Sequence, residues 1–470
     1  MSDNLYTLFA AGFPADRRKP CFILADGGEV SYAALESQVS RVAGHLIASG
    51  IQPGDRIVLK DDKSIAFVAI YLATLKAGAV FVPLNAAYTQ SEVDYFIDNA
   101  EPKRTITDAR GFVEQATASA HTLDHAIPRA PGDLASLIYT SGTTGRSKGA
   151  MLTHGNLAAN AKALHEIWAF TPNDVLLHAL PIFHVHGLFV AMHCAFLSGC
   201  PMIWLPKFTD ADVLAGLKRA TVMMGVPTFY TRLLANPAFT RESASNIRVF
   251  ISGSAPLLPT TFVEFEQRTG QRILERYGMS EAVIITSNPL EGDRIAGSVG
   301  YPLPGVELRI GGGQETGVIE IRGPSVFGAY WRMPEKTREE FTADGYFITG
   351  DVGRRDPDGR VYISGRAKDL IISGGYNVYP KEIELVLDEL PGVTESAVIG
   401  LPHADFGEAV CAVVIGAGDE AAMIAACRAK LAAFKTPKRI LFVDDLPRNA
   451  MGKVQKNLLR QQHAGLFGMA

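Results

Sequence analysis

Cysteines are few in this chain, and none of them stands in a pairing or metal-binding pattern. The 470 residues include five cysteines, an odd number, and no two of them have C-x-x-C spacing. This arrangement argues against a disulfide framework and against a zinc site built from thiolates. We therefore expect the cysteines to be buried, reduced thiols and the protein to be cytoplasmic.

A basic excess and long apolar runs are also missing. Lys and Arg number 45 against 49 for Asp and Glu, so the formal net charge is −4 and no cationic excess exists to displace counterions from nucleic acid. No stretch approaches the roughly 18 apolar residues of a membrane-spanning helix. Residues 1–9 lack the basic and apolar regions of a secretory signal. We expect neither nucleic-acid binding nor membrane insertion, and the sequence indicates no oligomeric state.

Strand and helix patterns alternate through much of the chain. Ser31 can cap one helix, and Thr89-Gln90-Ser91-Glu92 is a capping box that opens another. This alternation predicts an α/β fold with parallel or mixed sheets and crossover helices. Buried strands are expected at residues 56–59, 79–84, 134–138, 221–225 and 249–252.

The pattern changes twice towards the C-terminus. From about residue 300, short strands separated by turns predict a β-rich subdomain. Beyond residues 365–369 a compact α+β pattern follows, and 470 residues are too many for one ordinary core. We predict a large N-terminal domain, residues 1–367, and a small C-terminal domain, residues 368–470.

The most informative stretch is residues 139–149, which read Y-T-S-G-T-T-G-R-S-K-G. Glycines let backbone N–H groups approach an anion, the hydroxyls add donors, and Lys148 adds a positive charge. The spacing differs from that of a P-loop, G-x-x-x-x-G-K-[ST]. A flexible polar turn is the alternative, but the preceding strand favours a polyphosphate site at a sheet edge.

Two further loops combine small, aromatic and acidic residues. Residues 252–256, S-G-S-A-P, form a second small-residue loop after a strand pattern. In residues 277–281, Y-G-M-S-E, Tyr277 could stack on a base and Glu281 could hold Mg²⁺. Each of these loops is also compatible with an ordinary turn.

Three more segments are ambiguous when taken alone. His184 and His186, in the predicted loop P-I-F-H-V-H-G, could be a metal pair, a base, a pocket wall or structural histidines. Asp351 and Arg366 could hold a ribose, although T-G-D is a common turn. Lys453 lies on a glycine-containing loop and could equally be a solvated surface charge.

In this order the segments resemble the adenylate-forming superfamily of acyl-CoA synthetases, luciferases and peptide-synthetase adenylation domains. The resemblance extends from about residue 31 to residue 456, with departures at Arg146, where proline is common, and Ser280, where threonine is usual. It implies ATP, Mg²⁺ and coenzyme A, with a carboxylate converted first to an acyl-AMP and then to a thioester. It also implies a C-terminal domain that moves between the two steps.

The resemblance assigns roles by position. Lys453, Glu281, Ser280 and Lys148 would be catalytic, and Glu281 would be the metal ligand. Lys368 would be the hinge, and Gly374, Gly375 and Tyr376 would line the thiol's approach. The remaining nucleotide-binding positions are Thr140, Ser141, Gly142, Thr143, Thr144, Gly145, Gly253, Ser254, Ala255, Pro256, Tyr277, Gly278, Met279, Asp351 and Arg366.

Arg294 suggests which acid is used. A guanidinium at a pocket end suits a second carboxylate, whereas its spacing also allows an exposed ion pair with Glu291 or Asp293. Residues 181–188, 286–297 and 444–456 resemble malonyl-CoA synthetases, which implies that Arg294 and His184 bind a small dicarboxylic acid.

The segment 282–285, A-V-I-I, departs from that family and is more apolar. The resemblance implies malonate as the substrate, and the more apolar segment extends this expectation to methylmalonate. The alternatives are a ligase for short or medium-chain monocarboxylates and an enzyme that loads a carrier protein.

Overall fold

The computed structural model describes residues 3–140, 147–313, 315–448 and 453–468. Its contacts divide the chain into two compact units. Unit 1 comprises Met1–Leu308 and Ile321–Phe347, and unit 2 comprises Arg309–Glu320 and Ile348–Ala470. The predicted α/β fold, with a large sheet-containing N-terminal part and a small C-terminal part, is confirmed. The hinge between residues 367 and 368 stays a prediction.

Unit 1 contains strands of a long mixed sheet. Its central strands are parallel, and antiparallel pairs lie at both ends of the run. In spatial order these strands are β14 (Ser298–Pro302), β13 (Thr286–Ser287), β12 (Leu274–Tyr277), β11 (Val249–Ser252), β10 (Val222–Gly225), β8 (Leu176–His178), β9 (Met202–Trp204), β1 (Pro20–Leu24) and β2 (Glu29–Ser31).

A second sheet of unit 1 ends in a hairpin. Its first pairs are parallel, whereas β6 and β7 are antiparallel. The sequence did not predict β7, which makes the glycine-rich segment the connection of a β-hairpin. The strands in spatial order are β5 (Arg104–Ile106), β3 (Arg56–Lys60), β4 (Val80–Leu84), β6 (Leu134–Thr140) and β7 (Lys148–Thr153).

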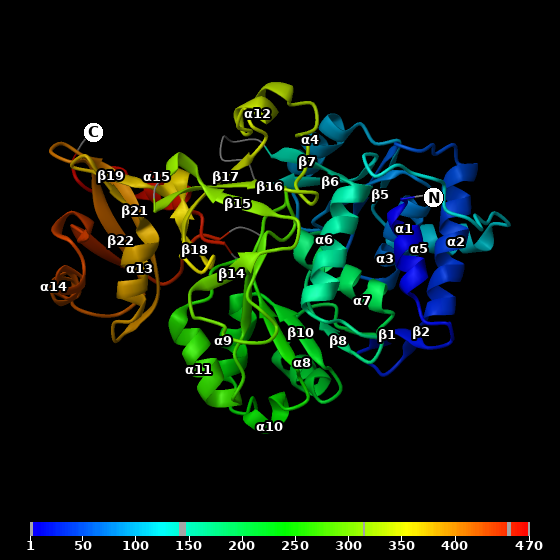
Figure 1. Cartoon of the computed structure of the whole chain (residues 1–470), viewed down its shortest axis with the longest axis horizontal. Coiled ribbons are helices and arrows are strands. Elements are labelled where there is room, and N and C mark those ends of the chain that lie inside the picture. The colour runs from blue at the N-terminus through cyan, green and yellow to red at the C-terminus, as the bar shows by residue number, and fades with distance from the viewer. Residues whose placement is uncertain (1–2, 141–146, 314, 449–452, 469–470) are drawn as a thin grey trace. The chain divides into compact units, whose positions relative to one another are not determined.

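Helices cover both sheets of unit 1, and their predicted caps are confirmed. Ser31 accepts the Ala34 N–H at 3.1 Å, and Thr89 with Glu92 forms the reciprocal capping box. In Figure 1, α2, α3 and α5 lie together, and α9 packs beside β10. The helices are α1 (Leu5–Gly12), α2 (Tyr32–Ala48), α3 (Ile65–Lys76), α4 (Gln90–Ala100), α5 (Ala109–Ala118), α6 (His154–Ile167), α7 (Met192–Ser198), α8 (Asp210–Leu217), α9 (Pro227–Ala235), α10 (Arg241–Ala244), α11 (Pro259–Thr269) and α12 (Pro334–Glu339).

Unit 2 contains two groups of paired strands. The first has the order β15 (Glu307–Ile310), β16 (Thr316–Arg322), β17 (Phe347–Arg355) and β18 (Val361–Arg366), and the chain crosses between the units within β15, β16 and β17. The second has the order β20 (Tyr376–Val378), β19 (Ile371–Ser373), β22 (Gly407–Gly416) and β21 (Val393–His403), with β23 (Arg439–Val443) also paired to β22.

The second sheet of unit 2 has apolar side chains on both faces. Along β21, Val398 belongs to one core cluster, whereas Ile399 belongs to the other. Successive side chains of a strand point to opposite faces, so helices are needed on both sides. Helices α13 (Pro380–Asp388) and α14 (Glu420–Lys430) cover the first face, and α15 (Lys456–Gln462) covers the second (Figure 1).

Two predictions from composition can be checked directly. All five cysteines are buried and free, as expected. Among the helices of the described ranges, none is long and apolar enough to cross a membrane.

Candidate active site

The predicted phosphate-binding segment connects the two strands of a hairpin. Thr140 ends β6 and lies opposite Lys148, the first residue of β7. The Thr140 hydroxyl lies 3.4 Å from the Lys148 carbonyl oxygen, to which it donates. The predicted binding residues Ser141, Gly142, Thr143, Thr144 and Gly145 lie outside the described residues.

Lys148 lies in an anionic and aromatic environment. Only 8% of the residue is exposed. Its Nζ lies 2.7 Å from Glu340 Oε1 and 4.2 Å from the ring centroid of Tyr330. Lys148 is thus held by an ion pair and a cation–π contact at the closed end of the hairpin.

Glu281 belongs to the same network. It is buried, and its Oε1 lies 2.9 Å from the Tyr330 hydroxyl, which also lies 2.7 Å from Glu340 Oε2. Burial and the neighbouring Glu281 charge raise the pKa of Tyr330, so the phenol stays protonated. Although burial opposes it, hydrogen bonds from Lys148 and Tyr330 lower the pKa of Glu340. The structure thereby brings together the predicted Lys148 and Glu281, and it adds Tyr330 and Glu340.

The two small-residue loops follow neighbouring parallel strands. Residues 253–256 follow β11, and Gly278 follows β12, so both loops emerge at the same edge of the sheet. A Cβ on Gly253 would lie 2.4 Å from Arg276 Cζ, and one on Gly278 would lie 2.0 Å from the Val283 carbonyl oxygen. Neither position has room for a side chain. The predicted adenine-binding loops are therefore neighbours, although their contact with adenine stays a prediction.

The turn that follows Glu281 is tightly held. Val283 has a left-handed φ of 61°, which is unusual for a β-branched residue. Asn160 on α6 donates from Nδ2 to the Ile284 carbonyl oxygen at 2.8 Å. Val283 and Ile284 are each 1% exposed, so the apolar departure from the malonate enzymes lies within the protein interior.

Next to these loops lies a buried cluster of polar side chains that includes Arg276, a residue that the sequence analysis missed. Arg276 is 4% exposed, and its Nε and Nη2 have no hydrogen-bond partner among the described residues. The same holds for His186 Nε2 and Ser252 Oγ. Burial lowers the pKa of Arg276 to about 9. Burial, followed by the Arg276 charge, lowers the pKa of His186.

A sequence clue to this cluster existed. Arg276 stands directly before the predicted base-stacking residue Tyr277, within a strand whose first three residues are buried. A charged residue in such a strand needs a partner. His186 also corrects an expectation, because it begins a π-helix (His186–Ala191) rather than lying in a loop. Its Nδ1 lies 3.2 Å from the Ser254 hydroxyl.

The two predicted acid-binding residues, His184 and Arg294, contact different backbone groups. His184 accepts the His186 backbone N–H at Nδ1, 3.3 Å away. Arg294 is half-buried and donates to three backbone carbonyl oxygens, those of Pro289, Arg272 and Leu290, at 3.1, 2.6 and 2.5 Å. In the described structure these carbonyls are the hydrogen-bond partners of Arg294, and Glu291 acts on it as a neighbouring charge.

In unit 2 the structure brings together the two residues that were predicted to hold the ribose. Asp351 on β17 lies opposite Arg366 on β18, and Arg366 Nε lies 2.7 Å from Asp351 Oδ1. Asp351 is 3% exposed. Its backbone N–H donates to the Thr349 hydroxyl at 3.1 Å. The pair therefore holds a carboxylate in a fixed position, while ribose binding stays a prediction.

The other predicted residues of unit 2 are more exposed. Lys368 is exposed on a 3₁₀ turn (Ala367–Asp369). Gly374 and Gly375 connect β19 and β20, and the adjacent Tyr376 is 60% exposed with its ring stacked on Phe434. Lys453 is exposed and directly follows residues 449–452, which lie outside the described residues.

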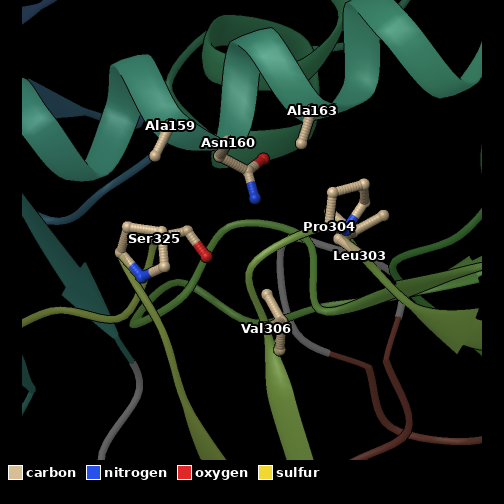
Figure 2. A pocket seen from close by; sticks show the side chains of 8 residues that line it. Ala159, Asn160, Ala163, Leu303, Pro304, Val306 and Ser325 are labelled. Atoms are coloured by element: carbon tan, nitrogen blue, oxygen red, sulfur yellow. The ribbon is translucent and has the colours of Figure 1, made fainter.

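Two cavities of unit 1 differ greatly in size. One has a volume of about 260 Å³ and is lined by residues that include Asn85, Pro181, Phe183 and Lys207. Phe183 directly precedes His184, so this cavity lies next to the predicted acid-binding segment. The other, between α6 and the loop that carries Pro304, is shown in Figure 2 and has a volume of about 10 Å³. That is room for about one water molecule.

Known proteins share this arrangement. The family model of AMP-binding enzymes matches residues 9–331, and the model of the AMP-binding enzyme C-terminal domain matches residues 382–453. The chain belongs to the AMP-binding enzyme family. This membership confirms the predicted resemblance to adenylate-forming enzymes.

Several members of the AMP-binding enzyme family are similar over nearly the whole chain. Malonate–CoA ligase of Arabidopsis thaliana is 35% identical, covering 98% of this chain and 89% of that protein. Feruloyl-CoA synthase of an Amycolatopsis species is 34% identical, covering 93% of this chain and 94% of that protein. The crystal structure of ATP-bound MatB from Rhodopseudomonas palustris is 50% identical, with a TM-score of 0.96 over 99% of this chain and 100% of that one.

Proposed function

We propose that this AMP-binding enzyme is an AMP-forming acid–CoA ligase that acts on a short dicarboxylic acid, malonate or methylmalonate. In the first half-reaction a carboxylate oxygen attacks the α-phosphorus of ATP, which forms the acyl-AMP and releases pyrophosphate. In the second, the CoA thiol attacks the acyl carbon, which forms the thioester and releases AMP. Similarity to malonate–CoA ligases of a plant and of mammals supports this reaction.

We choose a diacid because two guanidinium nitrogens of Arg276 are buried and have no hydrogen-bond partner among the described residues. Burying a charge without a partner is strongly unfavourable, so such groups are normally paired. His186 Nε2 is a further buried group without a partner among the described residues. A ligand carboxylate would supply oxygens for a two-pronged contact. We assign Arg276 the carboxylate that does not react.

Arg294 and His184 are the other candidates for this carboxylate. Arg294 already donates to three carbonyl oxygens, so its first role is to hold the loop of residues 289–294. A guanidinium has five N–H groups, so two remain that could donate to the carboxylate of the acid. His184 is half-buried and directly follows Phe183, which lines the larger cavity, and we assign it to the acid pocket.

Adenylation joins two anions, so the protein's task is to position them and neutralise charge. We assign Lys148 to the triphosphate and Lys453 to the reacting carboxylate and α-phosphate, with Ser280 beside them. Glu281 would hold Mg²⁺. The described residues contain no group of three or more His, Cys, Asp or Glu side chains that could hold a metal, and one carboxylate together with nucleotide phosphates is an ordinary Mg²⁺ site. When bound, Mg²⁺ would neutralise charge on the phosphate oxygens.

Thioester formation needs a different surface. We assign Lys368 the hinge about which residues 368–470 turn after adenylation, and Gly374, Gly375 and Tyr376 the approach of the CoA thiol. The exposed ring of Tyr376 is available for such a contact. We also propose a cytoplasmic location.

A pyrophosphate-release assay with a panel of acids, with and without CoA, tests the proposed function. Malonate and methylmalonate are expected to give the highest kcat/KM, followed by acetate, butyrate and octanoate. Arg276→Gln should remove the preference for diacids, whereas Arg294→Gln, the variant of the other candidate arginine, should leave it. Preference for a monoacid such as ferulate or octanoate would contradict the diacid assignment. Product formation with a carrier protein in place of CoA would identify the carrier-loading alternative.

A further inference from the structure

We infer that Glu340 is a positioning residue that holds Lys148 in the absence of a triphosphate and competes with the phosphates for its ammonium group. This inference rests on the proposed function, because it requires that Lys148 bind the triphosphate of ATP. Glu340 lies 192 residues from Lys148 in the sequence, and none of the recognised motifs contains it.

The ion pair is short and largely shielded from solvent. Lys148 Nζ and Glu340 Oε1 are 2.7 Å apart, and their side chains are 10% and 19% exposed. Such a pair is screened less by water and salt than a surface pair. One ammonium proton of Lys148 is donated to Glu340 and the group also faces the Tyr330 ring. A triphosphate that draws the ammonium towards its own oxygens therefore competes with an existing contact.

Glu340 is itself held in place from a second direction. The Tyr330 hydroxyl lies 2.7 Å from its other oxygen, Oε2, and 2.9 Å from Glu281 Oε1. A phenol has one proton and can donate it to only one of these carboxylates at a time. Tyr330 thus connects the carboxylate that competes for Lys148 to Glu281, the predicted metal ligand.

Backbone contacts hold the segment that carries Tyr330 beside the strand that begins at Lys148. Trp331 donates its N–H to the Gly149 carbonyl oxygen at 2.8 Å, and Tyr330 forms a β-bridge with Ala150. The segment that carries Tyr330 is therefore attached to β7, which begins at Lys148. The Tyr330 N–H also donates to the Thr337 hydroxyl of α12 at 3.0 Å, three residues before Glu340.

A second cation makes the exchange of partners reversible. Lys336 Nζ lies 3.3 Å from Glu340 Oε1, so Glu340 keeps a counterion when Lys148 turns to the phosphates. When pyrophosphate leaves, Glu340 is in position to take Lys148 back. The arrangement lowers the affinity for the triphosphate and for pyrophosphate, and it should not affect AMP, which lacks the β- and γ-phosphates.

Calorimetric titration of the full-length protein with ATP, pyrophosphate and AMP tests this. Glu340→Gln is expected to bind ATP and pyrophosphate about three- to tenfold more tightly than the wild type, with AMP affinity changed by less than about twofold. Glu340→Asp, which keeps the charge, should remain closer to the wild type. In a Lys148→Met background, Glu340→Gln should no longer change the affinity for pyrophosphate.

Two results would overturn the inference: an unchanged pyrophosphate affinity in Glu340→Gln, or a weaker one. A weaker affinity for both pyrophosphate and AMP, together with a lower melting temperature, would give Glu340 a purely structural role. A wild-type protein that binds no ATP would instead refute the proposed function on which the inference rests.

Discussion

Two proposed site cations of unit 1 and two proposed site lysines of unit 2 differ in how they are held. In unit 1, Lys148 is 8% exposed and Arg276 is 4% exposed, and close packing or an ion pair fixes each of them. In unit 2, Lys368 and Lys453 are exposed. Buried cations are suited to defining a binding site, because their positions and charges are fixed before a ligand arrives. Exposed cations are suited to a contact that must form and break within one catalytic cycle.

The largest effect expected from this contrast is on Lys453. Lys453→Ala should lower the rate of acyl-adenylate formation by roughly 10²- to 10³-fold, because one aligned charge donor is removed. Thioester formation from supplied acyl-adenylate should remain largely intact. The two half-reactions are measured separately by pyrophosphate release and by CoA consumption. If Lys453→Ala slowed both half-reactions equally, Lys453 would not be a cation that serves adenylation alone.

Arg276 should show the second largest effect. Arg276→Gln should lower kcat/KM for malonate by roughly 30- to 1,000-fold, which corresponds to truncation of one partner of a buried charge pair. The loss for butyrate should be below about threefold, because butyrate has no second carboxylate. Acid panels for the wild type and the variant measure this difference. A similar loss for both acids would mean that Arg276 only supports the loops above it.

Arg294 and Arg276, both in unit 1, are expected to differ in what their substitution changes. Arg294→Gln should lower the free energy of unfolding by about 1–3 kcal/mol, because backbone carbonyls lose charged donors, and should change the malonate-to-butyrate ratio little. Denaturant unfolding and the acid panel provide the two readouts. The opposite result, normal stability with a lost preference for malonate, would favour Arg294 as the residue that binds the second carboxylate.

The smallest expected effect is the change of stability with pH, which should have opposite signs in the two units. Burial lowers the pKa of His154 in unit 1 from 6.5 to about 4, so its stabilising contribution is present above pH 6.5 and is lost as the pH falls towards 4. Burial raises the pKa of Asp388 in unit 2 from 3.8 to about 6, so its contribution is full below pH 3.8 and is lost as the pH rises through 6. Each change is about 1–3 kcal/mol.

The tryptophans allow these signs to be measured separately. The chain has three, Trp168, Trp204 and Trp331, and all belong to unit 1. Tryptophan fluorescence during unfolding should therefore show unit 1 weakening between pH 6.5 and 4, and His154→Gln should reduce that slope. Amide exchange in α13 and β21 should show unit 2 becoming more stable over the same range. The same slope in both units would contradict the assignment.

Local patterns predicted much of the fold. Ser31 and Thr89 cap helices as expected, and the strands β3, β4, β6, β10 and β11 lie close to their predicted positions. These features depend on neighbouring residues, so they can be read from the sequence. The strand β7 was missed because it directly follows the glycine-rich segment, and its hairpin pairing with β6 is a tertiary property.

By itself, the sequence determined the order of the recognised motifs and the family to which they belong. Only the tertiary structure decided that Arg276 is buried, with two nitrogens that lack a partner among the described residues, and that Glu340 contacts Lys148 across 192 residues. The reason is physical. Burial and long-range electrostatic contacts depend on which distant segments the fold brings together, and residue type and spacing along the chain do not specify that.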